Sequence, residues 1–266
     1  MIGTIAAKTI RDQRRALIGW SAGMIGLVAL YGAFYPSIRG NAAQLERYLS
    51  NLPEAFRRAF GGGADFGTSV GYLNTELFSL LAPLLLMVLA IGAGARAIAG
   101  EEERRTLDLL LAYPVTRRDI VLEKLGAMVV ATSGVGAILW LAVAVLGPPF
   151  DLHVSLGNLA AACLAAVLLG LVFGTAALFL GCLRGRRGLA TALTGAAAVA
   201  LYLVDLLAPQ VEGVRWLETL SPFHYYLGPN PLMNGLPARY AALLIGLIVT
   251  FAIAAVVVFD RRDVAA

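Results

Sequence analysis

The sequence has few of the side chains from which soluble enzymes build their sites. Of its 266 residues only 14% are charged, and it contains two lysines, two histidines and two cysteines. It has no G-x-x-x-x-G-K-[ST] phosphate loop, and neither lysine follows a glycine, so we do not expect the chain to hydrolyse ATP by itself. His153 and His224 lack an H-E-x-x-H pattern or an accompanying acidic cluster. We therefore expect no catalytic residue, no metal ligand and no cofactor in this chain.

The cysteines exclude a disulfide framework. Cys163 and Cys182 fall in one apolar segment, and as parts of one helix they would lie about 28 Å apart at 1.5 Å per residue. Two cysteines at that distance cannot be bridged, so we expect both to be packing residues.

Long hydrophobic runs, by contrast, are abundant. Hydrophobic residues make up 59% of the chain and the mean hydropathy is +0.78, which is typical of an integral membrane protein. Runs of about 20 residues are long enough to cross the hydrocarbon core as helices. Six such segments lie at residues 16–38, 72–99, 125–146, 159–183, 188–208 and 240–259. The sequence thus predicts an all-α polytopic membrane protein with six transmembrane helices, forming a single transmembrane domain over residues 1–266.

The positions of lysine and arginine predict the orientation, because cytoplasmic loops retain positive charge during insertion. An even number of spans places both termini on one side. If that side is cytoplasmic, it holds fifteen of the 21 basic residues. The other six are Arg39, Arg47, Arg57, Arg58, Arg215 and Arg239. We expect a multi-pass protein of the plasma membrane with cytoplasmic termini, whose sequence pI near 9.3 reflects topology and not nucleic-acid binding.

The first fifteen residues are basic on one side and apolar on the other. Lys8, Arg11, Arg14 and Arg15 would lie on the charged face of a helix. We expect residues 1–15 to form an interfacial helix on the inner membrane surface. The alternative is an ordinary basic flank of the first span.

Two longer outer segments, residues 39–71 and 208–238, are expected to contain short interfacial helices. Residues 41–60 have apolar side chains at intervals of three and four, which predicts an amphipathic helix. The second segment contains Phe223, His224, Tyr225 and Tyr226 among five prolines. These aromatic residues suit either an outer gate over an exit path or an aromatic belt at the interface.

Three further patterns leave alternatives open. Gly67-Thr68-Ser69-Val70-Gly71 matches the G-x-S-x-G of serine hydrolases, but it lacks the strand-to-helix context that the motif needs. Gly-x-x-x-Gly pairs begin at Gly19, Gly170 and Gly181 and favour close helix packing in a bundle or a dimer. Glu76, Arg96 and Asp205 lie near predicted span ends, where an ionisable side chain either has a function or reaches the interface.

A charged stretch between the second and third spans, residues 100–118, is the most informative part of the chain. Glu101, Glu102 and Glu103 suit a helix N-terminus, and Glu101 stands four residues before Arg105. Three leucines at helical spacing, Leu107, Leu110 and Leu111, would form an apolar stripe. The pattern predicts a short surface helix that docks on another protein.

This stretch also carries a resemblance to a known family. The run from Gly100 through Thr106-Leu107-Asp108-Leu109-Leu110-Leu111 and Pro114-Val115-Thr116-Arg117 to Glu123-Lys124 closely resembles the loop after the second span in type-2 ABC exporter permeases of bacteria. The similarity extends to residues 8–15, 97–99 and 221–223. It departs from the family at Arg105, where a glycine is commoner.

The resemblance implies a six-helix permease that pairs with a second permease copy or homologue and with two separate ATPase subunits, which would bind ATP and Mg. Residues 100–124 would form the cytoplasmic coupling region. The residues expected to couple to the ATPase are Glu101, Glu102, Glu103, Arg104, Thr106, Leu107, Asp108, Leu110 and Leu111. We expect the leucines to anchor in a groove of the ATPase and the charged residues to set the register.

The expected function is therefore the membrane path of an ATP-driven exporter for a drug, antibiotic, lipid or other amphipathic compound. The alternative is an ABC-type membrane scaffold or maturation factor that transmits ATPase force to an extracytoplasmic partner. The sequence does not specify the substrate.

Overall fold

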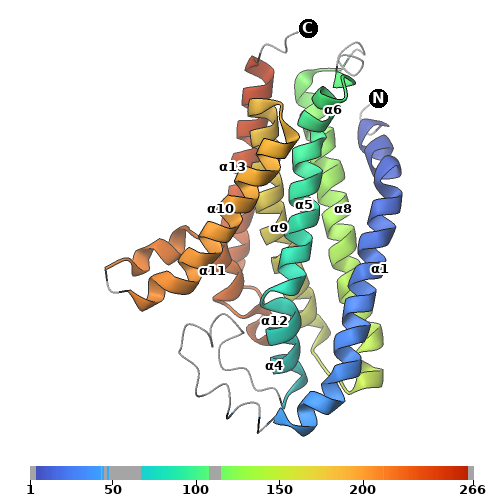
Figure 1. The fold of residues 1–266 in the computed structure, drawn as a ribbon, viewed down its shortest axis with the longest axis vertical. Helices are drawn as coiled ribbons and strands as arrows, with labels where there is room; N and C mark the ends of the chain where they lie inside the picture. Colours follow the sequence, from blue (N-terminus) through green and yellow to red (C-terminus); the bar gives the residue numbers. More distant parts are fainter. Residues whose placement is uncertain are drawn as a thin grey trace.

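The protein is a bundle of long helices. The computed structural model describes residues 4–42, 44, 47, 67–107, 115–211 and 213–262. Within these ranges there is no β-strand, and six helical segments are long and apolar enough to cross a membrane (Figure 1). They are Ile5–Gly40, Ser69–Ala97, Arg117–Leu146, Leu156–Arg184, Arg187–Gln210 and Ala238–Arg261. The predicted class, an all-α protein with six membrane-spanning helices, is confirmed.

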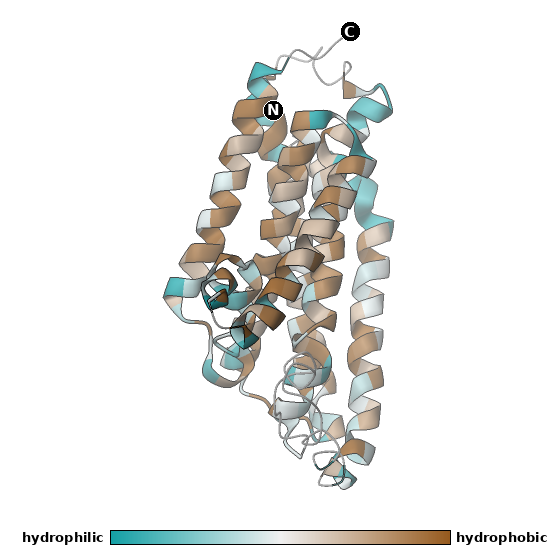
Figure 2. Ribbon diagram, turned by 60° about the vertical axis from the view of Figure 1, so that its left-hand side comes forward, coloured by the Kyte–Doolittle hydropathy of each residue, from teal (hydrophilic) through white to brown (hydrophobic). Residues whose placement is uncertain are grey.

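The two ends of the described chain lie at the same end of the bundle (Figure 1). We call this the terminal end and the opposite one the loop end. The long helices are α1 (Thr4–Gly40), α5 (Leu81–Ala97), α8 (Arg117–Leu146), α9 (Leu156–Arg184), α10 (Arg187–Leu207) and α13 (Ala238–Arg261). Hydrophobic residues line most of their length, and hydrophilic residues gather toward the two ends (Figure 2). This distribution is what a bilayer requires of a bundle that crosses it.

Helix α9 forms the centre of the bundle and packs against α5, α13, α8 and α10. Its closest neighbour is α5, and small residues allow their backbones to approach. A Cβ added at Gly174 would lie 2.9 Å from the Cβ of Ala90, and one added at Gly94 would overlap the backbone oxygen of Gly174. The Gly-x-x-x-Gly pair at Gly170 and Gly174 therefore serves packing inside this chain.

Helix α1 lies at the side of the bundle against α8. It is one continuous helix of 37 residues, so the prediction of a separate interfacial helix over residues 1–15 is wrong for the described part. No glycine or proline stands between Thr4 and Ile18, so nothing breaks the helix between its basic first turns and the apolar span. Lys8, Arg11, Arg14 and Arg15 are exposed on these first turns, which corresponds to the alternative of a basic flank.

The loop end consists of short elements. Before α5 lie α4 (Ser69–Leu73) and one turn of π-helix, η1 (Asn74–Phe78), and η2 (Pro148–Phe150) follows α8. Between α10 and α13 the chain forms η3 (Ala208–Gln210), η4 (Arg215–Leu220), α11 (Pro222–Leu227) and α12 (Pro231–Asn234). The amphipathic helix predicted over residues 41–60 falls almost wholly outside the described residues.

Candidate functional site

The charged stretch after the second span begins with a break in the helix. Helix α5 ends at Ala97, and α6 (Ala99–Glu103) follows as a separate short helix. Arg105 then adopts a left-handed backbone with φ 56°, a conformation that a right-handed helix cannot contain. The predicted continuous helix, with Glu101 and Arg105 on one face, is therefore wrong. The three glutamates of α6 have other partners.

Glu101 joins α6 to α8. Lys124 Nζ lies 2.7 Å from Glu101 Oε1, and the hydroxyl of Thr106 donates to the other carboxylate oxygen. Only 8% of the Lys124 side chain and 19% of the Glu101 side chain are exposed, so water screens the pair weakly. Burial of the carboxyl opposes its ionisation, but the hydrogen bonds from Lys124 and Thr106 and the charges of Lys124 and Arg104 outweigh this. The pKa of Glu101 consequently lies below its usual value.

Glu102 and Glu103 join α6 to two further helices. Arg262, just beyond α13, donates to both oxygens of the Glu102 carboxylate, at 2.6 and 2.9 Å. Such bidentate pairs are the strong ones among charged hydrogen bonds. The backbone N–H of Arg187, the first residue of α10, donates to Glu103 Oε1 at 2.8 Å, where the helix dipole favours a negative charge. The short helix α6 is thus fastened to α8, α10 and the end of α13.

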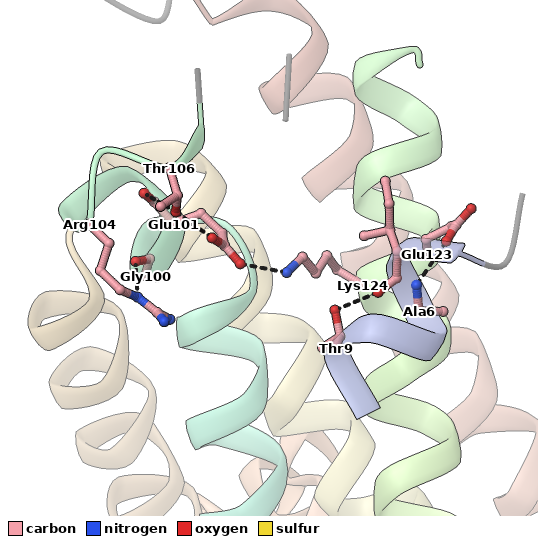
Figure 3. A network of polar contacts seen from close by, with 9 residues as sticks. Ala6, Thr9, Gly100, Glu101, Arg104, Thr106, Glu123 and Lys124 are labelled. Carbon is pink, nitrogen blue, oxygen red and sulfur yellow. Dashed lines mark hydrogen bonds and ion pairs between the residues drawn. The ribbon is translucent and has the colours of Figure 1, made fainter. Parts of the chain in front are cut away.

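A second carboxylate of α8 reaches in the opposite direction. Glu123 Oε2 accepts a hydrogen bond of 2.9 Å from the backbone N–H of Ala6 in the first turn of α1. Figure 3 shows the neighbours Glu123 and Lys124 pointing to α1 and to α6 respectively. Two adjacent residues of α8 therefore hold the helices on either side of it.

The terminal end also includes the last turn of α13. Arg117, at the start of α8, donates to the backbone oxygen of Phe259 at 3.2 Å and to that of Arg262. Arg118 forms an exposed ion pair of 2.9 Å with Asp260. The start of α8 is held in this way by the end of α13.

Leu107 does not offer its side chain to a partner. It is 2% exposed and packs in an apolar cluster with Ile98, Ile120, Leu178 and Phe259. The expectation that Leu107 anchors in a groove of another protein is therefore not met in this structure. Asp108, Leu110 and Leu111 lie outside the described residues. Arg104 and Arg105 are exposed, and the Nε of Arg104 donates to the backbone oxygen of Gly100 at 2.9 Å.

The four aromatic residues proposed for an outer gate divide into two pairs. Phe223 and Tyr226 are 5% and 2% exposed. Phe223 packs against Phe173, and the Tyr226 hydroxyl donates to the backbone oxygen of Phe78. Burial raises the pKa of the Tyr226 hydroxyl. The rings of His224 and Tyr225 are half-buried, next to each other. Two of the four thus belong to the packed bundle.

Ser69, the centre of the G-x-S-x-G match, lies at the loop end. Its hydroxyl donates to the backbone oxygen of Asp151 at 3.0 Å and lies 3.2 Å from the Tyr35 hydroxyl. Nδ1 of His153 contacts the same Asp151 oxygen at 3.1 Å. A serine nucleophile needs a base that accepts its proton, and here a carbonyl oxygen accepts that hydrogen bond. Among the described residues no group of three or more His, Cys, Asp or Glu side chains has a metal-binding arrangement.

The comparison with protein families decides the identity of the bundle. Residues 3–264 match the family described as "ABC-2 family transporter protein". The chain belongs to this family. No curated protein sequence matches the chain. Because the match covers almost the whole chain, the predicted resemblance to ABC-2 permeases is confirmed. An ABC-2 permease is a non-catalytic transmembrane component, and the family implies ABC ATPase partners and a lipid bilayer.

In this ABC-2 permease, sequence reasoning selected the acidic residues of the terminal end but missed their partners. The sequence identifies Lys124 only as part of a motif, and Arg187 and Arg262 only as two of the basic residues that indicate topology. One signal in the sequence was available, because Lys124 is one of two lysines and stands directly before the predicted span of residues 125–146. A charge in such a place needs a partner. For Arg262, which is 160 residues from Glu102, no local pattern identifies the partner.

Proposed function

We propose that this permease is the membrane subunit of an ATP-driven exporter. It acts with a second permease copy or homologue and with two ABC ATPase subunits, which supply ATP and Mg. The protein lies in the plasma membrane. Its terminal end is on the cytoplasmic side, because the arginines and lysines concentrate there. The amphipathic substrate, a drug, antibiotic or lipid-like compound, moves outward along the bundle.

The observation that carries this proposal is the attachment of α6. A force applied to α6 reaches α8 through Glu101 and Lys124, the end of α13 through Glu102 and Arg262, and α10 through the N–H of Arg187. Packed and hydrogen-bonded groups of this kind carry coupling between distant sites. The segment that begins with α6 is thus suited to receive the movement of an ATPase and to distribute it over three helices.

Because of these contacts, the glutamates of α6 are poor residues for a test of ATPase docking. Reversing the charge of Glu101 or Glu102 would break ion pairs inside the permease. Arg105 is a better probe, because it is exposed and its positive φ is equally strained with glutamate. We propose that Arg105 lies in the ATPase interface.

The test is co-purification of the tagged permease with co-expressed products of its neighbouring genes, probed for an ABC ATPase. Arg105→Glu should weaken the association roughly tenfold through like-charge contacts. Arg14→Glu, the same reversal at an exposed site on α1, is the control and should leave the association unchanged. Equal effects of both substitutions would refute the docking site. A permease that never retains an ATPase would refute the exporter itself.

A further inference from the structure

The terminal end contains a large charged cavity between α1, α5, α6 and α8. Its volume is about 870 Å³. The charged residues that line it are Lys8, Asp12, Arg96, Glu101, Arg104 and Lys124. The remaining lining residues include Ala16, Ala93, Ala97 and Met128. In Figure 3, the Lys124 side chain extends from α8 to Glu101 of α6, and the Arg104 side chain folds back on Gly100. The cavity is thus lined by both charged and apolar side chains.

Arg96 is the unusual residue of this cavity. It lies in the last turn of α5 and is half-buried. Its guanidinium folds back along α5, within 3.7 Å of the position that a Cβ on Gly92 would occupy. Within the described ranges no carboxylate pairs with it, and the charges that act on it most are those of Arg187 and Arg104. A partly buried cation that faces other cations is costly without an anion.

The other charges of the cavity do not supply that anion. Lys124 and Glu101 neutralise each other at 2.7 Å. Lys8 and Asp12 are exposed, one helical turn apart on α1, and carry opposite charges. The excess that remains comes from Arg96 and Arg104. Two guanidinium groups facing one space suit a group with several negatively charged oxygens, above all a phosphate.

An apolar groove continues from the cavity toward the middle of the bundle. This second cavity of about 460 Å³ shares Ala16 with the first and is lined by Gly19, Trp20, Gly23, Met24, Leu27 and Leu85. Helix α1 packs on α8. A Cβ added at Gly19 or Gly23 would meet nothing within 4 Å, so the groove is open beside these two glycines. From Ala16 to Leu27 the helix extends roughly 16 Å. That is about half of the hydrocarbon thickness, the depth of one leaflet.

We propose that the two cavities together form a binding site for an anionic phospholipid of the bilayer. The phosphate contacts Arg96 and Arg104, and an acyl chain lies in the groove along α1 beside Trp20. Charge complementarity commits the site to an anionic lipid, since a zwitterionic headgroup brings a cation of its own to the arginines. The site depends on this chain alone and stands independently of the proposed transport function.

Trp20 provides a direct measurement. In a Trp140→Phe/Trp216→Phe variant it is the only remaining tryptophan of the three in the chain. The permease, without any ATPase, is placed in bilayers of phosphatidylcholine and phosphatidylglycerol in equal amounts, with bromine on the acyl chains of one lipid at a time. We expect stronger quenching of Trp20 by brominated phosphatidylglycerol. Arg96→Gln should reduce the preference about fivefold, the contribution of one basic residue near a membrane surface.

Two controls separate this site from a general charge effect. Arg14→Gln removes an exposed positive charge from the same end of α1 outside the cavity and should leave the preference intact. Arg96→Lys keeps the positive charge and should retain part of the preference for phosphatidylglycerol. Equal quenching by both lipids in the Trp140→Phe/Trp216→Phe protein with Arg96 intact, or equal effects of Arg96→Gln and Arg14→Gln, would overturn the proposal.

The source of the phosphate is tested separately. Inorganic phosphate is added to the protein in pure phosphatidylcholine bilayers, and thermal unfolding is followed. If phosphate alone stabilises the protein and Arg96→Gln abolishes the effect, the site takes a free anion and the lipid assignment is wrong. Native mass spectrometry of the detergent-purified protein, with its three tryptophans, should find phosphatidylglycerol retained by Arg14→Gln and lost from Arg96→Gln. Loss of ATPase association would leave these results untouched, so the two proposals fail independently.

Discussion

Lys124 of α8 and Glu101 of α6 form an ion pair of 2.7 Å across the terminal end of the bundle. Lys124 stands on the helix that also holds the first turn of α1, through the neighbouring Glu123. Glu101 stands on the five-residue helix whose other two glutamates hold the end of α13 and the start of α10. The pair therefore connects α1 and α8 with α6, α10 and the end of α13. Its loss should affect both the stability of the bundle and the transmission of movement between these helices.

Removing the carboxylate charge tests the first effect. Glu101→Gln leaves the Lys124 ammonium, 8% exposed, without its counter-charge. We expect the permease in detergent to lose about 1–3 kcal/mol of stability, because a buried charged group that loses its partner is costly. Lys124→Met added to Glu101→Gln should restore part of this loss, since the unpaired ammonium is then gone. Thermal unfolding of the single and double variants measures both changes.

The chain offers a matched control for this prediction. Arg118 and Asp260 form an ion pair of similar length, but 66% of the Arg118 side chain and 37% of the Asp260 side chain are exposed. Arg118→Gln should cost less than about 1 kcal/mol, as exposed pairs do. If Glu101→Gln and Arg118→Gln destabilise the protein equally, the burial of the first pair has no energetic consequence.

The same carboxyl predicts a dependence on pH. The folded protein holds the pKa of Glu101 below its usual value, about 4.3 in an unfolded chain. The unfolded chain therefore binds this proton first, and the stabilisation is complete above the unfolded pKa and lost as the pH falls through the folded pKa. Melting temperatures measured from pH 7 downward should fall below about pH 4.3. In Glu101→Gln this part of the decline should be absent. If this variant and the unsubstituted protein lose stability identically as the pH falls, Glu101 is not the group responsible.

The contact between α5 and α9 predicts a different kind of sensitivity. Gly94→Ala places a methyl group on the backbone oxygen of Gly174, and backbone cannot move aside as a flexible side chain can. We expect a loss of at least about 1–3 kcal/mol from overpacking. Gly134→Ala on α8 is the control, because its Cβ meets nothing within 4 Å. It should be neutral or stabilising by up to about 1 kcal/mol, and unfolding in detergent distinguishes the two variants.

The sequence predicted the long helices well, because their signal is local. A run such as residues 159–183 is apolar over the length that a bilayer requires, and the helix observed there, α9, extends over Leu156–Arg184. The small residues of α9 also indicated close packing. Which helix would approach Gly170 and Gly174 was not predictable, since hydropathy contains no information on neighbours. The structure supplies α5 as that neighbour.

Charged elements at the helix ends were predicted less well. The basic pattern of residues 1–15 suggested a surface helix, but an amphipathic pattern does not say whether the chain bends before the next span. Leu107 had the spacing of an exposed stripe, yet it is buried, because the turn at Arg105 directs it toward Ile98 and Phe259. A single left-handed residue that is not glycine or asparagine has a weak signature in sequence.

The candidate site was predictable only in its acidic half. Three consecutive glutamates stand out within an apolar chain, whereas their partners come from α8, α10 and the residue after α13. Ion pairs between residues 160 positions apart follow from the packing of the bundle and not from local pattern. The neighbouring residues Arg261 and Arg262 illustrate this, because Arg262 is half-buried against the site and Arg261 is exposed.

These two arginines provide the last prediction. Arg262 donates to Glu102 at 2.6 and 2.9 Å and to the backbone oxygen of Cys182 at 3.2 Å, whereas Arg261 is exposed. Arg262→Ala should lower the stability by about 1–3 kcal/mol because it leaves Glu102 and a carbonyl without donors. Arg261→Ala should change it by less than about 0.5 kcal/mol.

The effect of Arg262→Ala on transport distinguishes docking of the ATPase from transmission of its movement. If α6 passes the ATPase movement to α13 through Glu102 and Arg262, Arg262→Ala should still co-purify with the ATPase but export less substrate for each ATP hydrolysed. Arg261→Ala should retain both properties. Proteoliposomes with the reconstituted complex allow ATP hydrolysis and transport to be measured on one sample. A normal ratio of transport to hydrolysis in Arg262→Ala would show that movement does not pass through this ion pair, even if the variant melts at a lower temperature.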